Sequence, residues 1–258
     1  MKSKILSILL AFFLSTNAFA GVTFDETDDR IDLGTTGLPT QASAITLFAV
    51  FELGDLSGNK TIVGDWNGNC VIGCNWLMNF EDAATDLLYV GKGNGGGGYN
   101  RITFSSPSSG VVYRMAAGLI ADGSTACRGN LNGTTSTTCT FWFNSNAGTS
   151  QDPNIGDLNG GGAGNPFKGN IYTVCIWSSL LTAAEMSQLV TSQTKNVCSQ
   201  ISPSTLEGEY YLDDQPDGTS GDGDTFRDRS ENINNGVGND GANNTGLTMI
   251  AEKVSTYP

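Results

Sequence analysis

The chain has 258 residues with 26 acidic and 13 basic side chains, and its formal net charge at pH 7 is −13. This charge argues against nucleic acid and anionic membrane surfaces as partners, because both are themselves negatively charged. The sequence contains no histidine, which excludes Ser-His and Cys-His nucleophile pairs, His-ligated zinc and histidine general bases.

The first twenty residues have the pattern of a secretory signal peptide. Lys2 and Lys4 precede an apolar run over residues 5–13, and Ala18-Phe19-Ala20 is a small-x-small cleavage motif. The run is shorter than the roughly 20 residues that a membrane-spanning helix needs. We therefore expect a signal peptide over residues 1–20, a single domain over residues 21–258, no membrane insertion, and a secreted, periplasmic or cell-surface location. An uncleaved N-terminal anchor is the alternative.

Short apolar or alternating segments separated by glycine and asparagine dominate the rest of the chain. Many short strands between turn signals are typical of a sandwich or barrel. The sequence therefore predicts an all-β protein, an antiparallel β-sandwich of the jelly-roll kind. The strand segments are residues 45–51, 76–80, 87–90, 111–117, 141–143 and 171–177.

One short helix is predicted from residue 182 to near Gln193. Thr182 and Glu185 form a capping box, in which the Thr hydroxyl accepts from the N3 amide and the Glu reaches back. Met186, Leu189 and Val190 follow at helical spacing. We expect this helix to cover one edge of the sandwich.

Six cysteines behind a signal peptide predict three disulfides. We expect sequential pairing, as Cys70–Cys74, Cys127–Cys139 and Cys175–Cys198. The second pair lies almost symmetrically about Asn132-Gly133, a strong hairpin-turn signal. A structural metal site is the alternative, but the chain has no Cys-x-x-Cys pair.

Two groups of residues are candidates for binding. Aromatic rings beside polar, Gly-rich segments can stack on sugar rings, and carboxylates in a flexible loop can supply the six to eight oxygens that calcium takes. A solvated acidic loop is the alternative for the second group. The ligand-binding candidates are Trp66, Asn67, Trp76, Tyr99, Asn100 and Arg101, and the metal candidates are Asp213, Asp214, Asp222, Asp224 and Asp228.

Three segments together resemble the laminin-G-like (concanavalin A-like) family of jelly rolls. They are residues 22–33, where Glu26 stands in place of the family's usual Gly; residues 167–177 with the helix start at 180–185; and residues 210–213 with 228–236. The last segment often opens such domains but here comes late in the chain, so the order looks circularly shifted. Relatives of this kind often bind calcium at a loop rim, which favours a calcium cofactor.

The sequence favours a binding module over an enzyme. Glycosidases need two positioned carboxylates, and the nearest match to the acidic motif of laminarinase-like relatives is Glu207-Gly208-Glu209, which lacks its Asp and third acid. We expect an exported module that recognises a carbohydrate or surface glycoconjugate, with calcium as a candidate support. The alternatives are a structural or protein-interaction domain without a sugar site, and a glycan-cleaving enzyme.

Overall fold

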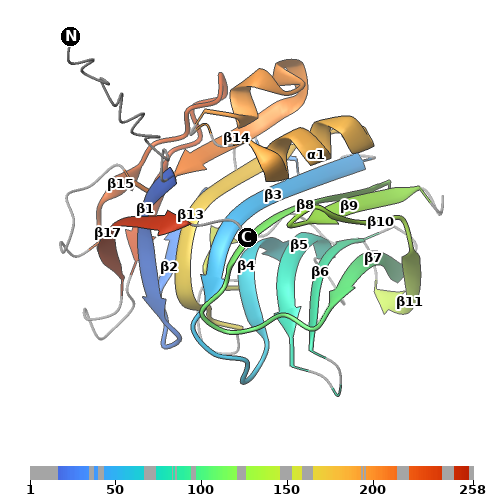
Figure 1. Cartoon of the computed structure of the whole chain (residues 1–258), viewed down its shortest axis with the longest axis horizontal. Coiled ribbons are helices and arrows are strands. Elements are labelled where there is room, and N and C mark those ends of the chain that lie inside the picture. Colours follow the sequence, from blue (N-terminus) through green and yellow to red (C-terminus); the bar gives the residue numbers. More distant parts are fainter. Residues whose placement is uncertain are drawn as a thin grey trace, which may run out of the picture.

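A computed structural model shows two stacked antiparallel β-sheets and one α-helix in the residues that it describes (Figure 1). The structure describes residues 17–34, 38–39, 44–66, 74–82, 84, 86–93, 97–120, 126–145, 153–158, 165–192, 194, 196–213, 221–239 and 247–255. The predicted all-β sandwich with one short helix is confirmed.

Sheet A has eight strands. Their order in space is β10 (Thr134–Ser136), β9 (Cys127–Leu131), β8 (Val112–Ile120), β3 (Ala44–Leu53), β13 (Lys168–Trp177), β1 (Asn17–Asp25) and β17 (Thr248–Ser255), with β14 (Leu206–Tyr211) beside the second half of β13. The pairing of β1 with β17 places the two ends of the described chain side by side.

Sheet B has nine strands. Their order is β11 (Cys139–Ser145), β7 (Gly97–Ser105), β6 (Leu87–Gly93), β5 (Cys74–Glu81), β4 (Lys60–Trp66), β12 (Asn154–Ile155), β2 (Arg30–Asp32), β16 (Gly236–Asn239) and β15 (Thr225–Phe226). Strands β4 to β7 are joined as successive antiparallel neighbours.

The main core lies between the two sheets. Alternating residues of each strand point inward, as the period of two requires, and Phe51, Met78, Val90 and Ile176 are each fully buried there.

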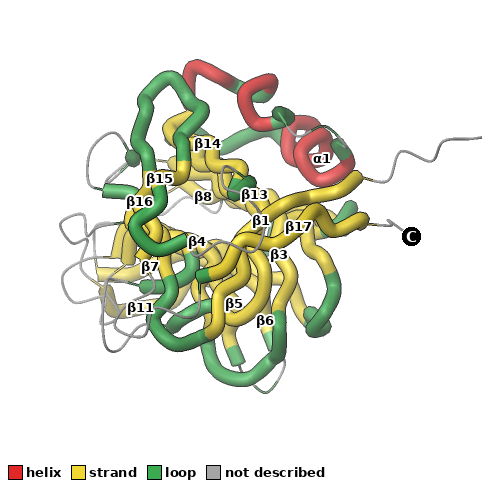
Figure 2. The backbone as a smooth tube through the Cα atoms, turned by 90° about the vertical axis from the view of Figure 1, so that its left-hand side faces the viewer, coloured by secondary structure: helices red, strands yellow, loops and turns green. Residues whose placement is uncertain are grey.

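The helix α1 (Ala183–Thr191) begins at the predicted capping box. The Thr182 hydroxyl accepts from the Glu185 amide, and the Glu185 carboxylate accepts from the Thr182 amide at 2.7 Å. Hydrogen bonds from Ser202 and Thr182 hold the pKa of Glu185 below its usual value. Two 3-10 turns follow, η1 (Cys198–Gln200) and η2 (Pro203–Thr205). In two views at right angles, α1 lies on the side of the sandwich away from β5 and β6 (Figure 2).

The hairpin turn predicted at Asn132-Gly133 is also confirmed, and Glu26 adopts a positive φ despite not being glycine. Asn132 and Gly133 both have positive φ, 47° and 87°, and join β9 to β10, as a tight hairpin of this kind requires. Glu26 has φ 76°, so a non-glycine residue occupies the turn position where the resembling family has glycine. Ion pairs from Glu26 to Lys60 and Lys168 hold this turn against the sheet.

The predicted pairs Cys127–Cys139 and Cys175–Cys198 are both present. The first joins β9 of sheet A to β11 of sheet B, and the second joins β13 to η1. The third predicted pair, Cys70–Cys74, lies outside the described residues because Cys70 is not described.

Strand β1 begins at Asn17, which is ahead of the expected cleavage point before Gly21. The pairing of Val22 to Asp25 with β13 lies entirely beyond that point. No helix in the described part of the chain is long and apolar enough to cross a membrane.

Candidate functional site

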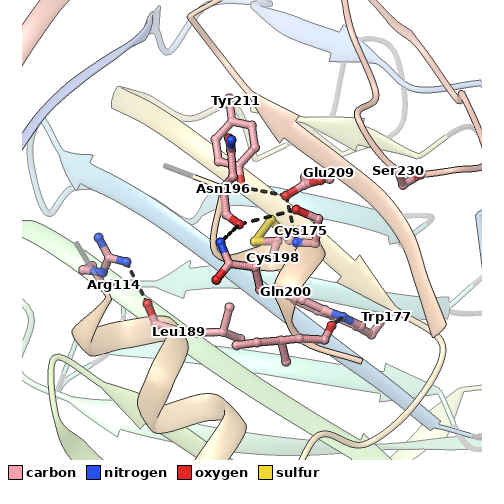
Figure 3. The surroundings of a disulfide bond; sticks show 12 residues. Arg114, Cys175, Trp177, Leu189, Asn196, Cys198, Gln200, Glu209, Tyr211 and Ser230 are labelled. Atoms are coloured by element: carbon pink, nitrogen blue, oxygen red, sulfur yellow. Dashed lines mark hydrogen bonds between the residues drawn. A yellow bond between two sulfur atoms is a disulfide. The ribbon is translucent and has the colours of Figure 1, made fainter. Parts of the chain in front are cut away.

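The helix α1 packs on part of the outer face of sheet A, against β8 and β9. Met186, Leu189 and Val190 of the helix are buried in a second core, together with Phe48 and Trp177 of the sheet. Arg114 of β8 also binds the helix to the sheet, because its guanidinium donates to the Leu189 carbonyl at 2.7 Å (Figure 3).

The surroundings of the Cys175–Cys198 disulfide are likewise closed. The buried Glu209 carboxylate accepts from the Tyr211 hydroxyl at 2.6 Å and from the Ser199 amide at 3.0 Å (Figure 3). These two cysteines and Glu209 lie close enough to one another to share a metal ion. The sulfurs are bonded to each other instead, so this group stabilises the fold and leaves no thiolate for a metal.

The outer face of sheet B carries one continuous cross-strand row. Directly paired residues of antiparallel strands share a face, and the pairing runs unbroken from β15 to β11. The row consists of Thr225, Val237, Asp32, Asn154, Gly64, Leu77, Gly91, Arg101 and Thr140.

The middle of this row is buried and its ends are exposed. Leu77 and Asn154 have exposed fractions of 2% and 0%, and a Cβ on Gly64 would lie 3.1 Å from the Leu77 Cβ. Val237, by contrast, is 47% exposed. A solute approaching this row therefore meets the β2–β16 end rather than the middle.

Four residues on two adjacent strands form this end, and we call them the β2–β16 patch: Arg30, Asp32, Val237 and Asn239. Arg30 pairs with Asn239 and Asp32 with Val237. Arg30 Nε donates to Asp32 Oδ1 at 2.7 Å, and Asn239 Nδ2 donates to Asp32 Oδ2 at 3.3 Å. The patch thus combines hydrogen-bonding groups of fixed orientation with one exposed apolar side chain.

Polar groups are also buried close to the patch. Asn154 is fully buried beside Asp32, and neither of its amide atoms has a hydrogen-bond partner in the described part of the chain. Burial raises the pKa of Asp157 to about 6, although the Leu158 amide and Arg30 lower it. The same cause raises the pKa of Asp29 to about 7. Further hydrogen-bonding groups therefore lie close to the half-buried Asp32 carboxylate.

The other half of the outer face holds a second polar group. Arg101 forms an ion pair with Glu81 at 2.6 Å and lies over the Tyr89 ring, 5.5 Å from its centroid. The Asn79 amide donates to the Tyr89 hydroxyl and accepts from Thr61. Tyr89 and Arg101 are only 9% and 8% exposed, so this group mainly fixes neighbouring strands together.

The six ligand-binding candidates do not form one surface. Trp76 is fully buried in the main core and its indole donates to the Pro39 carbonyl at 2.7 Å. Asn100 is 1% exposed and faces sheet A, where its amide donates to the Ile120 carbonyl at 3.5 Å. Arg101 lies on the opposite, outer face. Asn67 and the side chains of Trp66 and Tyr99 lie outside the described residues.

The metal candidates are spread along the β14–β15 connection and, for Asp228, the β15–β16 loop. Asp228 is buried, and its two oxygens accept from the Glu209, Ser230 and Asn234 amides and from the Ser230 hydroxyl. A cation at Asp228 would have to displace these bonds, which hold the loop together.

The remaining metal candidates differ in exposure. Asp213 forms an ion pair with Arg229 at 3.2 Å, Asp222 is exposed and Asp224 is half-buried. Asp214 lies outside the described residues. Within the described part of the chain, these carboxylates do not gather into a group of three or more that could share a cation. The calcium site therefore stays a prediction.

The β2–β16 patch was not predicted from the sequence. A short strand with a polar outer face could have been predicted here, because the apolar Ile31 lies between the charged Arg30 and Asp32. No local pattern links this segment to residues 237–239, which come some two hundred positions later and join it only through sheet pairing.

No protein-family profile matches the chain, and no curated protein matches it. Among solved structures, a Bacteroides ovatus protein described as a candidate carbohydrate-binding protein is similar, with a TM-score of 0.59 and 20% identity, over 90% of this chain and 60% of that one. The chain thus spans 60% of the length of that protein.

Two further structures are similar over a smaller part of this chain. The enzymatically active domain of tailspike protein 2 from bacteriophage CBA120 gives a TM-score of 0.50 and 13% identity, over 76% of this chain and 30% of that one. The CBM40 of the Ruminococcus gnavus IT-sialidase, solved with sialyllactose, gives a TM-score of 0.48 and 15% identity, over 67% of this chain and 97% of that one. At these identities the likeness to the Bacteroides ovatus and tailspike structures shows a shared fold alone.

Proposed function

We propose that this protein is an exported, non-catalytic module that binds glycans through the β2–β16 patch on the outer face of sheet B. The observation that carries the proposal is the hydrogen-bonded set of Arg30, Asp32 and Asn239 around the exposed Val237. Sugars offer hydroxyl groups and apolar C–H faces, and sites for them combine a few oriented polar groups with apolar contact area.

Two further observations support this choice of face. The helix α1 and the second core occupy part of the outer face of sheet A, which leaves less of that face open to a ligand. The structural likeness to a Bacteroides ovatus protein described as a candidate carbohydrate-binding protein agrees with a glycan ligand.

The test is a glycan array probed with the full chain, followed by titration of the strongest hit. We expect Asp32→Asn to weaken binding about tenfold, since a hydrogen bond to a charged group contributes about 1.5–3 kcal/mol. Glu207→Gln on β14 is the matched control, because Glu207 is also a half-buried carboxylate that accepts side-chain hydrogen bonds.

Equal loss of affinity in both variants, or none in Asp32→Asn, would place binding elsewhere. An array without any hit would favour the structural or protein-interaction alternative.

We keep calcium as a separate proposal, resting on Asp213, Asp214, Asp222 and Asp224. Thermal unfolding with calcium and with a chelator tests it, because a cation that binds only the folded state stabilises it by about 2.7 kcal/mol at a hundredfold excess over Kd. An unfolding temperature that is the same in millimolar calcium and in chelator would rule such a site out.

A further inference from the structure

A second polar row lies inside the sandwich, on the inner face of sheet B. Asp65, Trp76, Lys92 and Asn100 are paired in that order across β4, β5, β6 and β7. Trp76 belongs to the main core. Because directly paired residues share a face of the sheet, the other three side chains also point toward the core. Their exposed fractions are 0% for Asp65, 3% for Lys92 and 1% for Asn100.

The Asn100 side chain is buried without adequate partners. The Asn100 Oδ1 has no hydrogen bond in the described part of the chain, and its Nδ2 has only the long bond to Ile120. Leaving buried polar groups unpaired costs about 1–3 kcal/mol each.

Lys92 has the electronic character of a nucleophile. Burial lowers the pKa of its amine to about 8, against the opposing attraction of Asp65. A fraction of the amine is therefore neutral at neutral pH, and a neutral, desolvated amine attacks carbonyl carbon.

Lys92 and Asn100 are also direct cross-strand partners. Directly opposite residues of antiparallel strands have Cβ atoms about 4.5–5.5 Å apart. A reaction between groups held on one face in this way is effectively unimolecular, which lowers its barrier.

From this pairing we propose that Lys92 and Asn100 form an intramolecular isopeptide bond that cross-links β6 to β7. The Lys92 Nζ attacks the Asn100 Cγ, so that the Nζ–Cγ bond forms and the Cγ–Nδ2 bond breaks. The proton lost from Nζ passes to Nδ2, which leaves as ammonia. No oxidant, reductant or second reactant is needed.

Asp65 is the carboxylate of the same row and the group suited to transfer this proton. Its Oδ2 accepts from the Asn75 Nδ2 at 2.7 Å, which orients it. The product replaces a buried amine and a buried primary amide with one neutral amide, so it removes the cost of burying the lysine charge.

The test is intact-mass measurement of the reduced full chain together with a tryptic map. We expect a mass lower than that of the sequence by one ammonia molecule. We also expect no cleavage after Lys92, which instead appears in a single peptide over residues 61–101 that carries an internal loop from Lys92 to Asn100. Because succinimide formation at an asparagine also releases ammonia but leaves lysine cleavable, the map separates the two reactions.

Variants assign the reacting groups. Lys92→Arg should restore the full mass, Asp65→Asn should slow the loss of ammonia, and Lys168→Arg, which changes an exposed lysine, should leave the cross-link in place. A wild-type chain of full mass that trypsin cuts after Lys92 would overturn the proposal, whatever the variants do. The result is independent of glycan binding.

Discussion

At the scale of single residues, buried carboxylates decide how stability depends on pH. Asp29 is 1% exposed, its Oδ2 accepts from the Asp25 amide at 2.6 Å, and its Oδ1 has no partner in the described part of the chain. Burial raises the pKa of Asp29 to about 7, so the folded state binds this proton more tightly than the unfolded chain does. Its contribution is therefore complete below the unfolded pKa, near 4, and is lost as the pH rises through about 7.

We accordingly expect Asp29→Asn to be more stable than the wild type at pH 8, by up to about 4 kcal/mol since each unit of pKa is worth about 1.4 kcal/mol. At pH 4 the two proteins should be nearly equal. Urea unfolding at both pH values measures the difference.

Asp55→Asn is the control with the opposite sign. Although its own burial opposes the shift, hydrogen bonds from Lys168 and Lys60 hold the pKa of Asp55 well below its usual value. Its contribution is present at neutral pH and is lost on acidification, so this variant should be less stable at pH 8. A pH profile that is identical for wild type and Asp29→Asn would show that Asp29 ionises normally.

At the scale of elements, the loop between β15 and β16 holds a residue in a strained conformation. Ile233 has φ 55° and is 70% exposed, although β-branched residues are strongly disfavoured at positive φ. The loop is held in place around it, because Asn234 donates its amide to Asp228 at 2.8 Å and accepts from the Tyr210 hydroxyl at 2.7 Å.

We expect Ile233→Asn to raise the free energy of unfolding by about 1 kcal/mol, because the left-handed region costs most L-residues about 1–2 kcal/mol and Asn tolerates it better. Val111→Asn is the control, as it also changes an exposed valine or isoleucine but at an ordinary φ. Thermal unfolding of the wild type and the two variants measures the difference in stability. If both substitutions stabilise equally, apolar exposure and not backbone strain is the cause.

The elements that the sequence predicted well are those with a local physical signal. The capping box at Thr182 is specified by four consecutive residues and the turn at Asn132 by two, so both can be recognised without knowing the strand pairing. The β2–β16 patch and the inner row of Lys92 and Asn100 could not be predicted in the same way, since strand register brings their members together. Trp76 shows the limit of composition as a guide: a Gly- and Asn-rich neighbourhood suggested an exposed ring, but alternation along β5 directs it into the core.

At the scale of the whole molecule, one disulfide joins the two sheets. Cys127 and Cys139 close a short segment between β9 and β11. We expect the double variant Cys127→Ala/Cys139→Ala to lose about 2–4 kcal/mol of unfolding free energy. Glycan affinity should be retained below the lowered unfolding temperature, because β2 and β16 lie at the other end of sheet B. Loss of affinity in a variant that remains folded would show that the binding surface extends to β11.

The proposed function depends on glycan binding to the outer face of sheet B at its β2–β16 end. Amide hydrogen exchange of the full chain, with and without the strongest array hit, tests it most directly. We expect slower exchange confined to residues 30–32 and 236–239 and their neighbours in sheet B, with α1 and β14 unchanged. Slower exchange over α1 and β14, with residues 30–32 unchanged, would contradict it.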